Sequence, residues 1–394
     1  FDSQTLPKDP PMTPFRPLSL SILSLALGAA LCAPAQAQSL LALVESARTH
    51  DTAWQSARAQ LDAAARKADQ ARAGLLPSAA LTGGLTRSNV ELSKPRIENT
   101  GTAQTVGINA SQPLYRPANR ITLEQGQRGV EVAQAQLDAA TQDLLVRVSQ
   151  AYFDVLAAQD TLTFVQAQKA AVSEQLAAAK RNFEVGTTTV TDSREAQARY
   201  DLVIAQEIAA ENDLRVKSLA LDQLVGITGT KPLPLALPVQ LPSVVPDNLA
   251  TWVDTARDQQ PGVRQAAIAL DIARLETKKA ETGHLPTVDL QAGYNVTRNL
   301  HGTITSPGVT ARSNAASVGV ALNLPLFAGF AVQNRVKETL ALETKAAADL
   351  ETARRSVAQA TRAAFYGVQS GQGQVQALEA AEASRQSALD VNQP

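Results

Sequence analysis

Four segments alternate apolar and polar residues at every second position, which is the pattern of β-strands with two different faces. These segments cover about 78–89, 103–114, 287–298 and 315–326. Two polar stretches, 89–101 and 299–314, join the members of each pair and are expected to be loops. The pattern therefore predicts two hairpins of two strands each.

Most of the remaining chain is helix-forming. The longest run extends from Ala118 to about Glu184, is interrupted only by Gly126 and Gly129, and predicts a rod of roughly 100 Å. Apolar residues recur every seven positions along this run in two series, Val130, Leu137, Leu144 and Ala151, and Val148, Val155 and Leu162. A following helix is expected over 193–225, and it has the same spacing at Leu202, Ala209 and Val216. Further helices are expected at 40–73 and 247–282, and a second rod from Ala331 onward. We expect long coiled-coil hairpins in which short helices stacked end to end cover a rod.

The first rod reverses direction in a turn over residues 185–192. The turn includes Val185, Gly186, Thr187 and Val190. Glycine tolerates the left-handed conformation that a tight helical reversal uses. Asp192, with Glu195 three residues later, is expected to be the N-cap of the returning helix in a near capping box. Asp192 either only caps this helix or belongs to a functional tip.

The chain contains an internal repeat. An offset of 209 residues aligns Gly74-Leu75-Leu76-Pro77 with Gly283-His284-Leu285-Pro286, and an offset of 212 aligns Pro113-Leu114-Tyr115 with Pro325-Leu326-Phe327. The expected strand–helix transitions are marked by Gly74, Pro77, Pro113, Gly283, Pro286 and Pro325. A proline-rich linker over 226–246 separates a first copy, 38–225, from a second copy, 247–394.

The segment 1–37 is interpreted as an upstream leader followed by a secretory signal peptide. Its apolar run, 18–31, is too short to span a bilayer, and Ala35 and Ala37 suit cleavage by signal peptidase. The only cysteine, Cys32, lies within it, so the mature chain is expected to have no disulfide and no thiol nucleophile.

Composition argues against several function classes. The net charge is −1 and charged residues make up 19% of the chain, well mixed, so nothing indicates a nucleic-acid partner. The three histidines, His50, His284 and His301, are scattered, and no histidine or carboxylate cluster has metal-ligand spacing. We therefore expect no enzyme activity, no catalytic or metal site and no cofactor.

Strands of roughly ten residues with one apolar face have the length and pattern of strands that cross an outer membrane. A soluble two-faced sheet is the alternative, and the signal peptide and the repeat favour the membrane. Four strands cannot close a barrel, and lipid does not tolerate open edges, so several chains must share one. Two chains would give about eight strands and three about twelve, and a conducting lumen favours three.

The duplicated order of helix, two strands, rod, turn and short helix resembles the TolC family of outer-membrane efflux proteins. The matching motifs are Gly283-His284-Leu285-Pro286 before a strand, Pro325-Leu326-Phe327 after one, and Asn182-Phe183-Glu184-Val185-Gly186 leading to Thr191-Asp192. The resemblance covers essentially 39–392. It implies a mainly α fold with a membrane β-barrel portion, in which each chain adds four strands to a shared, trimeric, twelve-stranded barrel.

The same resemblance implies a homotrimer in outer-membrane lipid of a Gram-negative bacterium, with a long periplasmic tunnel docked to a periplasmic adaptor and an inner-membrane transporter. The linker 226–246 would lie in the tunnel's equatorial region, and the turn 185–192 would be the docking tip. Thr191 and Asp192 fall where the family's tip residues bond to tyrosine and arginine of the second tip to hold the tunnel shut. Those partners lie beyond Pro394, so we interpret the second copy as incomplete and the chain as C-terminally truncated.

Two function classes remain beside each other at this stage. A channel protomer for efflux or type I secretion accounts for the strands and the rods. A periplasmic adaptor also has long helical hairpins, but it needs a lipoyl-like β domain flanking a single hairpin, and none is visible. The sequence does not indicate which cargo or which transporter is used.

Overall fold

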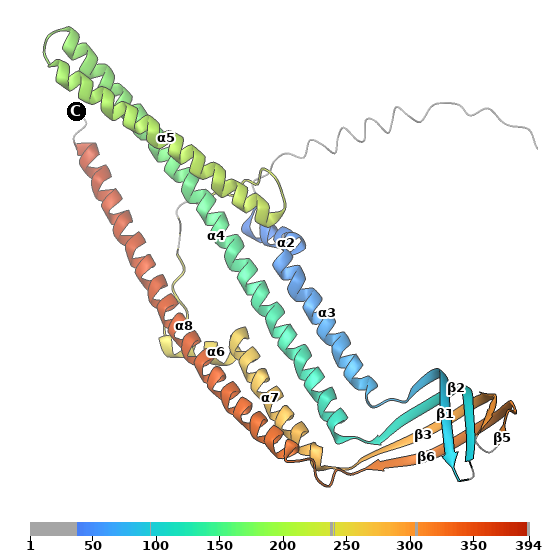
Figure 1. Cartoon of the computed structure of the whole chain (residues 1–394). Helices are drawn as coiled ribbons and strands as arrows, with labels where there is room; N and C mark the ends of the chain where they lie inside the picture. The colour runs from blue at the N-terminus through green and yellow to red at the C-terminus, as the bar shows by residue number, and fades with distance from the viewer. Residues whose placement is uncertain (1–37, 95, 237–238, 240, 304–305, 392–394) are drawn as a thin grey trace, which may run out of the picture. The chain divides into compact units, whose positions relative to one another are not determined.

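The computed structural model describes residues 38–94, 96–236, 239, 241–303 and 306–391. The expected signal peptide, with Ala35 and Ala37, lies outside the described residues. The described residues divide into two compact units, one from the ranges 38–45 and 150–234 and the other from the ranges 46–149 and 235–391. The expectation of a mainly helical fold with four long strands is confirmed (Figure 1).

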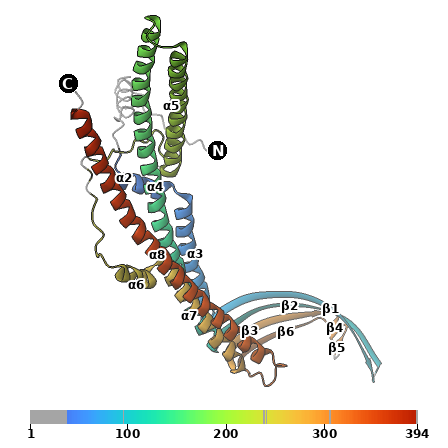
Figure 2. The same cartoon turned by 90° about the vertical axis from the view of Figure 1, so that its left-hand side faces the viewer.

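Four long strands form one antiparallel sheet in the order β1-β2-β3-β6. Their bounds are Ser78–Ser93 for β1, Arg96–Tyr115 for β2, Thr287–Leu300 for β3 and Ala311–Asn323 for β6. Two short strands, β4 (Gly302–Thr303) and β5 (Ser306–Pro307), pair with each other near the end of β3. The two halves of the chain therefore meet at the β2–β3 junction, while β1 and β6 form the sheet edges (Figures 1 and 2).

The expected loop over 89–101 is wrong, because β1 and β2 stay paired from Asn89–Thr100 to Ser93–Arg96. The expected loop over 299–314 is also partly wrong, since β3 continues to Leu300 and β6 starts at Ala311. A ladder needs only backbone groups, so it continues where the side chains no longer alternate.

At the other end, β6 stops at Asn323, so Pro325 and Leu326 lie beyond it, although the expected strand ran to 326. Proline has no amide hydrogen to donate to a ladder, which explains why the strand ends before it.

The first copy contains four helices. They are α2 (Leu40–His50), α3 (Thr52–Ala73), α4 (Pro117–Glu184) and α5 (Val190–Val225). The first rod is confirmed, since α4 is a single helix of 68 residues. The expected single helix over 40–73 is wrong, because the helix is interrupted at Asp51. Aspartate is poor inside a helix and favoured at an N-cap, and the Asp51 side chain accepts a hydrogen bond from the Trp54 amide.

The second copy contains α6 (Leu249–Gln259), α7 (Pro261–Glu281), the one-turn helix η1 (Thr282–His284) and the second rod, α8 (Ala331–Val391). The expected single helix over 247–282 is wrong, because Pro261 starts a new helix. Proline cannot continue a helix, but its fixed φ suits the first helical position. Gln260 caps α7 by accepting a hydrogen bond from the Val263 amide at 3.0 Å.

Helices α7 and α8 lie side by side (Figures 1 and 2) and pack through a narrow apolar seam. Its buried members are Val263, Leu270 and Leu350, flanked by Ala266, Ala267, Ala346, Ala353 and Val357. Polar contacts continue the seam, since the Thr277 hydroxyl donates to the Glu343 carboxylate at 3.2 Å. The spacing of seven between Val263 and Leu270, with small residues around them, is coiled-coil packing.

In the other unit, α5 packs on the second half of α4 through Val165, Val203 and Ala210. The seam expected through Leu202, Ala209 and Val216 is wrong for this contact. Leu202 and Val216 are exposed, and the adjacent positions Val203 and Ala210 are buried instead. A period of seven fits either of two neighbouring faces of a helix, so the pattern alone does not identify which one meets α4.

The linker begins at Gly226, whose left-handed φ of 74° ends α5. It then pairs with the start of the described chain. The Gln38 amide donates to the Lys231 carbonyl at 2.9 Å, and the Leu233 amide donates to the Gln38 carbonyl at 3.1 Å. The Tyr152 hydroxyl on α4 donates to the Leu233 carbonyl at 2.6 Å. These bonds hold the first part of the linker against its own unit.

Asp51 generates the first testable prediction. Its side chain is 7% exposed, caps α3 and accepts a hydrogen bond from the Arg147 guanidinium at 2.9 Å. Burial alone would raise the pKa of the carboxyl, but the bonds from Arg147 and the Trp54 amide outweigh it and lower the pKa. We expect Asp51→Ala to lower the free energy of unfolding by about 1–2 kcal/mol at pH 7, as loss of a cap does.

Asp51→Asn is the matched control, because asparagine keeps the cap and loses the charge. A lowered pKa stabilises the fold above the ordinary value of about 4, and this contribution disappears as the pH falls through the lowered pKa. In thermal unfolding followed by circular dichroism, the difference between wild type and Asp51→Asn should therefore be constant from pH 7 to about pH 5 and shrink below about pH 4. A difference that does not change with pH would contradict the charge contribution.

Candidate functional site: the sheet face and the hairpin turn

One face of the four-stranded sheet is apolar and uncovered. Cross-strand pairing aligns Leu81 of β1 with Ile108 of β2 and Tyr294 of β3, and Val318 of β6 lies on the same face. Leu81 is 74% exposed, Ile108 57% and Val318 80%. Water does not favour so large an apolar surface, so a surface of this kind marks contact with lipid or with another protein.

The opposite face is polar and hydrogen-bonded across strands. The Thr105 and Thr297 hydroxyls share a hydrogen bond of 3.3 Å between β2 and β3. The side-chain amide of Asn109 on β2 donates to the Thr82 hydroxyl on β1 at 3.1 Å. The sheet therefore has one apolar and one polar face, the pattern of strands whose two sides meet different surroundings.

The two edge strands, β1 and β6, have no strand on their outer sides in the described chain. Each is 13 residues or longer, so each edge has a row of backbone groups available for pairing. Sheet edges of this length need a partner or a cover.

A bidentate ion pair lies at the base of the β2–β3 junction, the end where β2 stops and β3 begins. Arg116, directly after β2, donates from Nε to one Asp289 oxygen at 2.8 Å and from a terminal nitrogen to the other at 2.6 Å. The Asp289 side chain is 10% exposed and that of Arg116 is 44% exposed. The sequence interpretation missed this pair, because the two residues belong to different copies and only the β2–β3 register brings them together. The only signal in the sequence was an aspartate at the third position of one strand and an arginine just after another strand.

The residues expected at strand–helix transitions lie at or next to such transitions. Gly74 caps α3, Gly283 lies in η1, and Pro77 and Pro286 stand just before β1 and β3. Pro113 lies inside β2, where the register with β3 shifts. A side chain at Gly283 would lie 3.0 Å from Val332 of α8, so glycine allows η1 to approach the start of the second rod.

The hairpin turn joins α4 to α5 between Glu184 and Val190. Gly186 has the left-handed φ of 80° that the pattern predicts. The Thr187 amide donates to the Asn182 carbonyl at 2.9 Å and closes the end of α4. Val185 is 73% exposed. Together with Val190, which is also exposed, it puts apolar surface on the turn.

The expected N-cap at Asp192 is wrong, because Thr189 caps α5 and Asp192 is the third residue of the helix, the N3 position of the capping box. The Asp192 amide donates to the Thr189 hydroxyl at 3.3 Å, and the Thr189 amide donates to Asp192 Oδ2 at 2.9 Å. The hydrogen bonds from the Thr189 amide and then its hydroxyl lower the pKa of the Asp192 carboxyl. The helix starts one turn earlier because threonine is also a favoured N-cap and Asp192 at N3 completes the capping box. Thr191 takes no part in this box.

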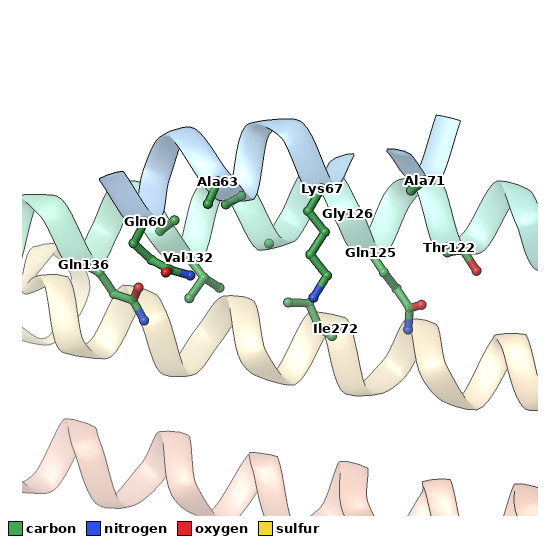
Figure 3. A pocket seen from close by; sticks show the side chains of 13 residues that line it. Gln60, Ala63, Lys67, Ala71, Thr122, Gln125, Gly126, Val132, Gln136 and Ile272 are labelled. Carbon is green, nitrogen blue, oxygen red and sulfur yellow. The ribbon is translucent and has the colours of Figure 1, made fainter. Parts of the chain in front are cut away.

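A cavity of about 510 Å³ lies between α3, α4 and α7 (Figure 3). Its lining is mostly alanine, glycine and glutamine, and Lys67 of α3 extends toward Ile272 of α7. Within the described parts of the chain, no three histidine, cysteine or carboxylate side chains gather to hold a metal ion.

None of the described helices is both long enough and apolar enough to cross a membrane.

Comparison with known proteins gives one consistent set of relatives. The family model described as outer membrane efflux protein matches residues 43–227 and 252–393. The chain is 34% identical to the outer membrane protein TolC of Vibrio cholerae, over 91% of this chain and 80% of the relative. It is 29% identical to the proteases secretion protein PrtF of Dickeya chrysanthemi, over 90% of this chain and 78% of the relative.

Solved structures share the fold. The outer membrane protein VceC of Vibrio cholerae superimposes with a TM-score of 0.72 at 20% identity, covering 89% of this chain and 84% of VceC. The outer-membrane channel OprN superimposes with a TM-score of 0.73 at 20% identity, covering 89% of this chain and 79% of OprN.

The capping box generates the second prediction. We expect Thr189→Ala to remove the cap and to increase amide hydrogen exchange in the first turn of α5 about three- to tenfold, with no change in the sheet. Thr191→Ala is the matched control, because it removes a neighbouring threonine that is outside the box. Equal exchange rates in the two variants, measured by mass spectrometry, would show that the box does not stabilise the turn.

Proposed function

Because the chain belongs to the outer membrane efflux protein family, we infer that its sheet and rods form one wall segment of an outer-membrane channel for efflux or type I secretion. One observation carries this inference: a sheet with an exposed apolar face, a polar face and two unpaired edges. Lipid satisfies the apolar face, a water-filled lumen satisfies the polar face, and further strands satisfy the edges.

The barrel is completed by copies of the same chain. Each chain contributes the four strands β1, β2, β3 and β6, so the number of strands is a multiple of four. About eight strands leave an interior filled by side chains, whereas about twelve leave room for a conduit. A homotrimer with a twelve-stranded barrel is therefore the smallest assembly that conducts.

The helical part forms the periplasmic tunnel that continues this barrel. The rods α4 and α8 start close after β2 and β6, so each strand pair leads into a rod. At about 1.5 Å per residue, the 68 residues of α4 correspond to about 100 Å of helix. Helices of this length suit a duct that reaches from the outer membrane toward an inner-membrane transporter.

The hairpin turn is the candidate docking and gating element. Val185 and Val190 offer exposed apolar contacts to the tip of a periplasmic adaptor, with Gly186 and Thr187 shaping the turn between them. Thr191 and Asp192 form the first-copy half of a gate that closes the tunnel by bonding to a second hairpin tip. Both capping bonds to the Asp192 side chain use Oδ2, so Oδ1 takes no part in the box.

The adaptor alternative is not favoured, because the relatives are named as outer membrane proteins and the fold is that of outer-membrane channels. The family is a transport family, and we propose that this chain catalyses no reaction. The family model is described as outer membrane efflux protein and PrtF as a proteases secretion protein, so small molecules and polypeptides are both cargo candidates.

The third prediction concerns conductance. The purified protein, reconstituted in a planar lipid bilayer, should give discrete conductance steps, because a shared barrel encloses a continuous lumen. Oligomeric mass is measured on the same sample. An oligomer that inserts in the bilayer without any conductance would contradict the channel.

The fourth prediction separates gating from capping at the turn. In protein that carries both hairpin tips, Asp192→Ala should loosen the closed tunnel and raise the mean conductance severalfold, and should also increase antibiotic sensitivity of cells that rely on this channel. Thr189→Ala is the control, because it weakens the same capping box but keeps the carboxylate. Equal increases in both variants would mean that fraying of α5, and not a gate bond, opens the tunnel.

A further inference from the structure

Two arginines lie directly opposite each other on the apolar face of the sheet. The β3–β6 register pairs Arg298 with Arg312. Side chains alternate between the faces of a sheet, so both arginines share the face of Val296 and Tyr294. Both arginines are exposed. Directly opposed like charges destabilise a sheet, so this pair has a cost that the two strands do not offset.

The two arginines have no counter-ion within the described chain. Neither takes part in an ion pair among the described residues. On the other side of Arg298 lies the uncharged Gln104 of β2. The acidic residues of the same face, Glu91 and Glu98, lie opposite each other, and Glu98 is six residues from Gln104 along β2. This separation corresponds to about 20 Å, which is too far for an ion pair.

The position of the arginine pair along the strands fits the border of a lipid layer. The apolar face begins with Val288 opposite Leu322, and Arg298 lies ten residues further along β3. Ten residues span about 33 Å along a strand, which becomes about 25 Å of height at a tilt of about 40°. The lipid-facing apolar band of outer-membrane strands is also about 25 Å tall, and a lipid-facing arginine costs little at its border.

The direction of β3 indicates which border this is. The strand starts two residues after η1 and runs away from the helices, so Arg298 lies near the end of the sheet that is remote from the rods. The rods form the periplasmic part of the proposed channel. The remote end then faces the cell exterior, where the outer leaflet of a Gram-negative outer membrane consists largely of a glycolipid whose sugar headgroup bears phosphates.

We propose that Arg298 and Arg312 form a binding site for a phosphate on the lipid headgroup of the outer leaflet. The inference rests on the proposed function, because it takes the apolar face to lie in an outer membrane. A guanidinium is a planar fork of N–H donors that matches the oxygens of a phosphate. One phosphate between the two arginines bonds to both and removes their repulsion. The bound lipid then anchors the sheet at one height in the membrane.

A phosphorylated lipid fits this surface better than a free anion does. The rows of the same face next to the arginines are apolar, and Tyr294 and Val318 are 50% and 80% exposed. A lipid satisfies both parts of the surface, because its phosphate meets the arginines and its acyl chains cover the apolar rows. Free phosphate would satisfy the charges alone and would leave the apolar rows in water.

Lipid binding by the purified protein tests the site as the fifth prediction. The probe is lipid A, an acylated glucosamine disaccharide with two phosphates, and its dephosphorylated form is the reference. In native mass spectrometry from detergent, the wild type should bind lipid A at least about tenfold more tightly than the reference. Arg298→Gln/Arg312→Gln should lose this preference, because glutamine stays polar but has no charge.

The double variant Arg362→Gln/Arg385→Gln is the matched control. Both of these arginines are exposed on α8, and their removal changes the net charge by the same amount, so this variant should keep the preference. In detergent without lipid, the unfolding temperature of Arg298→Gln/Arg312→Gln should not fall below that of the wild type, because the substitution removes opposed like charges. A lower temperature would show that the arginines stabilise the sheet by themselves and would contradict the site.

The outcomes separate this inference from the proposed function. An unchanged preference in Arg298→Gln/Arg312→Gln, measured on protein that conducts in a planar bilayer, would overturn the lipid site alone. Inorganic phosphate that binds as tightly as lipid A would identify a site for free anions and would overturn the lipid as its occupant. Protein that neither oligomerises nor conducts would overturn the proposed function itself.

Discussion

A backbone amide or carbonyl inside a hydrocarbon layer has no water to bond, so a sheet that faces lipid must pair both of its edges. This constraint falls on β1 and β6, which one chain leaves without outer neighbours. In the proposed membrane setting, lipid satisfies the apolar face and excludes open edges. Assembly of several chains would then be a condition for a stable sheet. Each rod begins close after a strand, so the proposed ring would also set the arrangement of the rods.

The internal duplication means that the chain is built from one repeated structural unit. One unit of two strands and one rod appears twice, and its two hairpins pair through β2 and β3 into one sheet. The helices pack through few buried residues. Small residues along α7 and α8 let the two helices approach closely, and a seam of few buried apolar residues is sufficient to hold them. A duct wall of this kind needs no thick hydrophobic core, which agrees with the abundance of alanine and glutamine in the chain.

The sequence predicted the periodic features well and the local breaks poorly. Alternation and long helix-forming runs identified the strands and both rods, because each depends on many residues at once. Breaks depend on single residues whose alternatives differ little in energy. Asp51 and Pro261 each interrupt a run that looks continuous, and Thr189 replaced Asp192 as the cap because both residues are good N-caps. The Arg116–Asp289 pair joins two copies, so it could be found only once their register was known.

That ion pair also distinguishes the β2–β3 junction from the two outer edges of the sheet. The sequence offsets place Ala328 and Ala80 at the positions equivalent to Arg116 and Asp289. The base of the inner junction thus has a charged clamp beside its backbone ladder, whereas each outer edge has alanine at both positions. In the proposed ring of several chains, the contacts inside each chain would therefore resist a twisting load more than the contacts between chains. Deformation of that ring would then concentrate at the borders between chains.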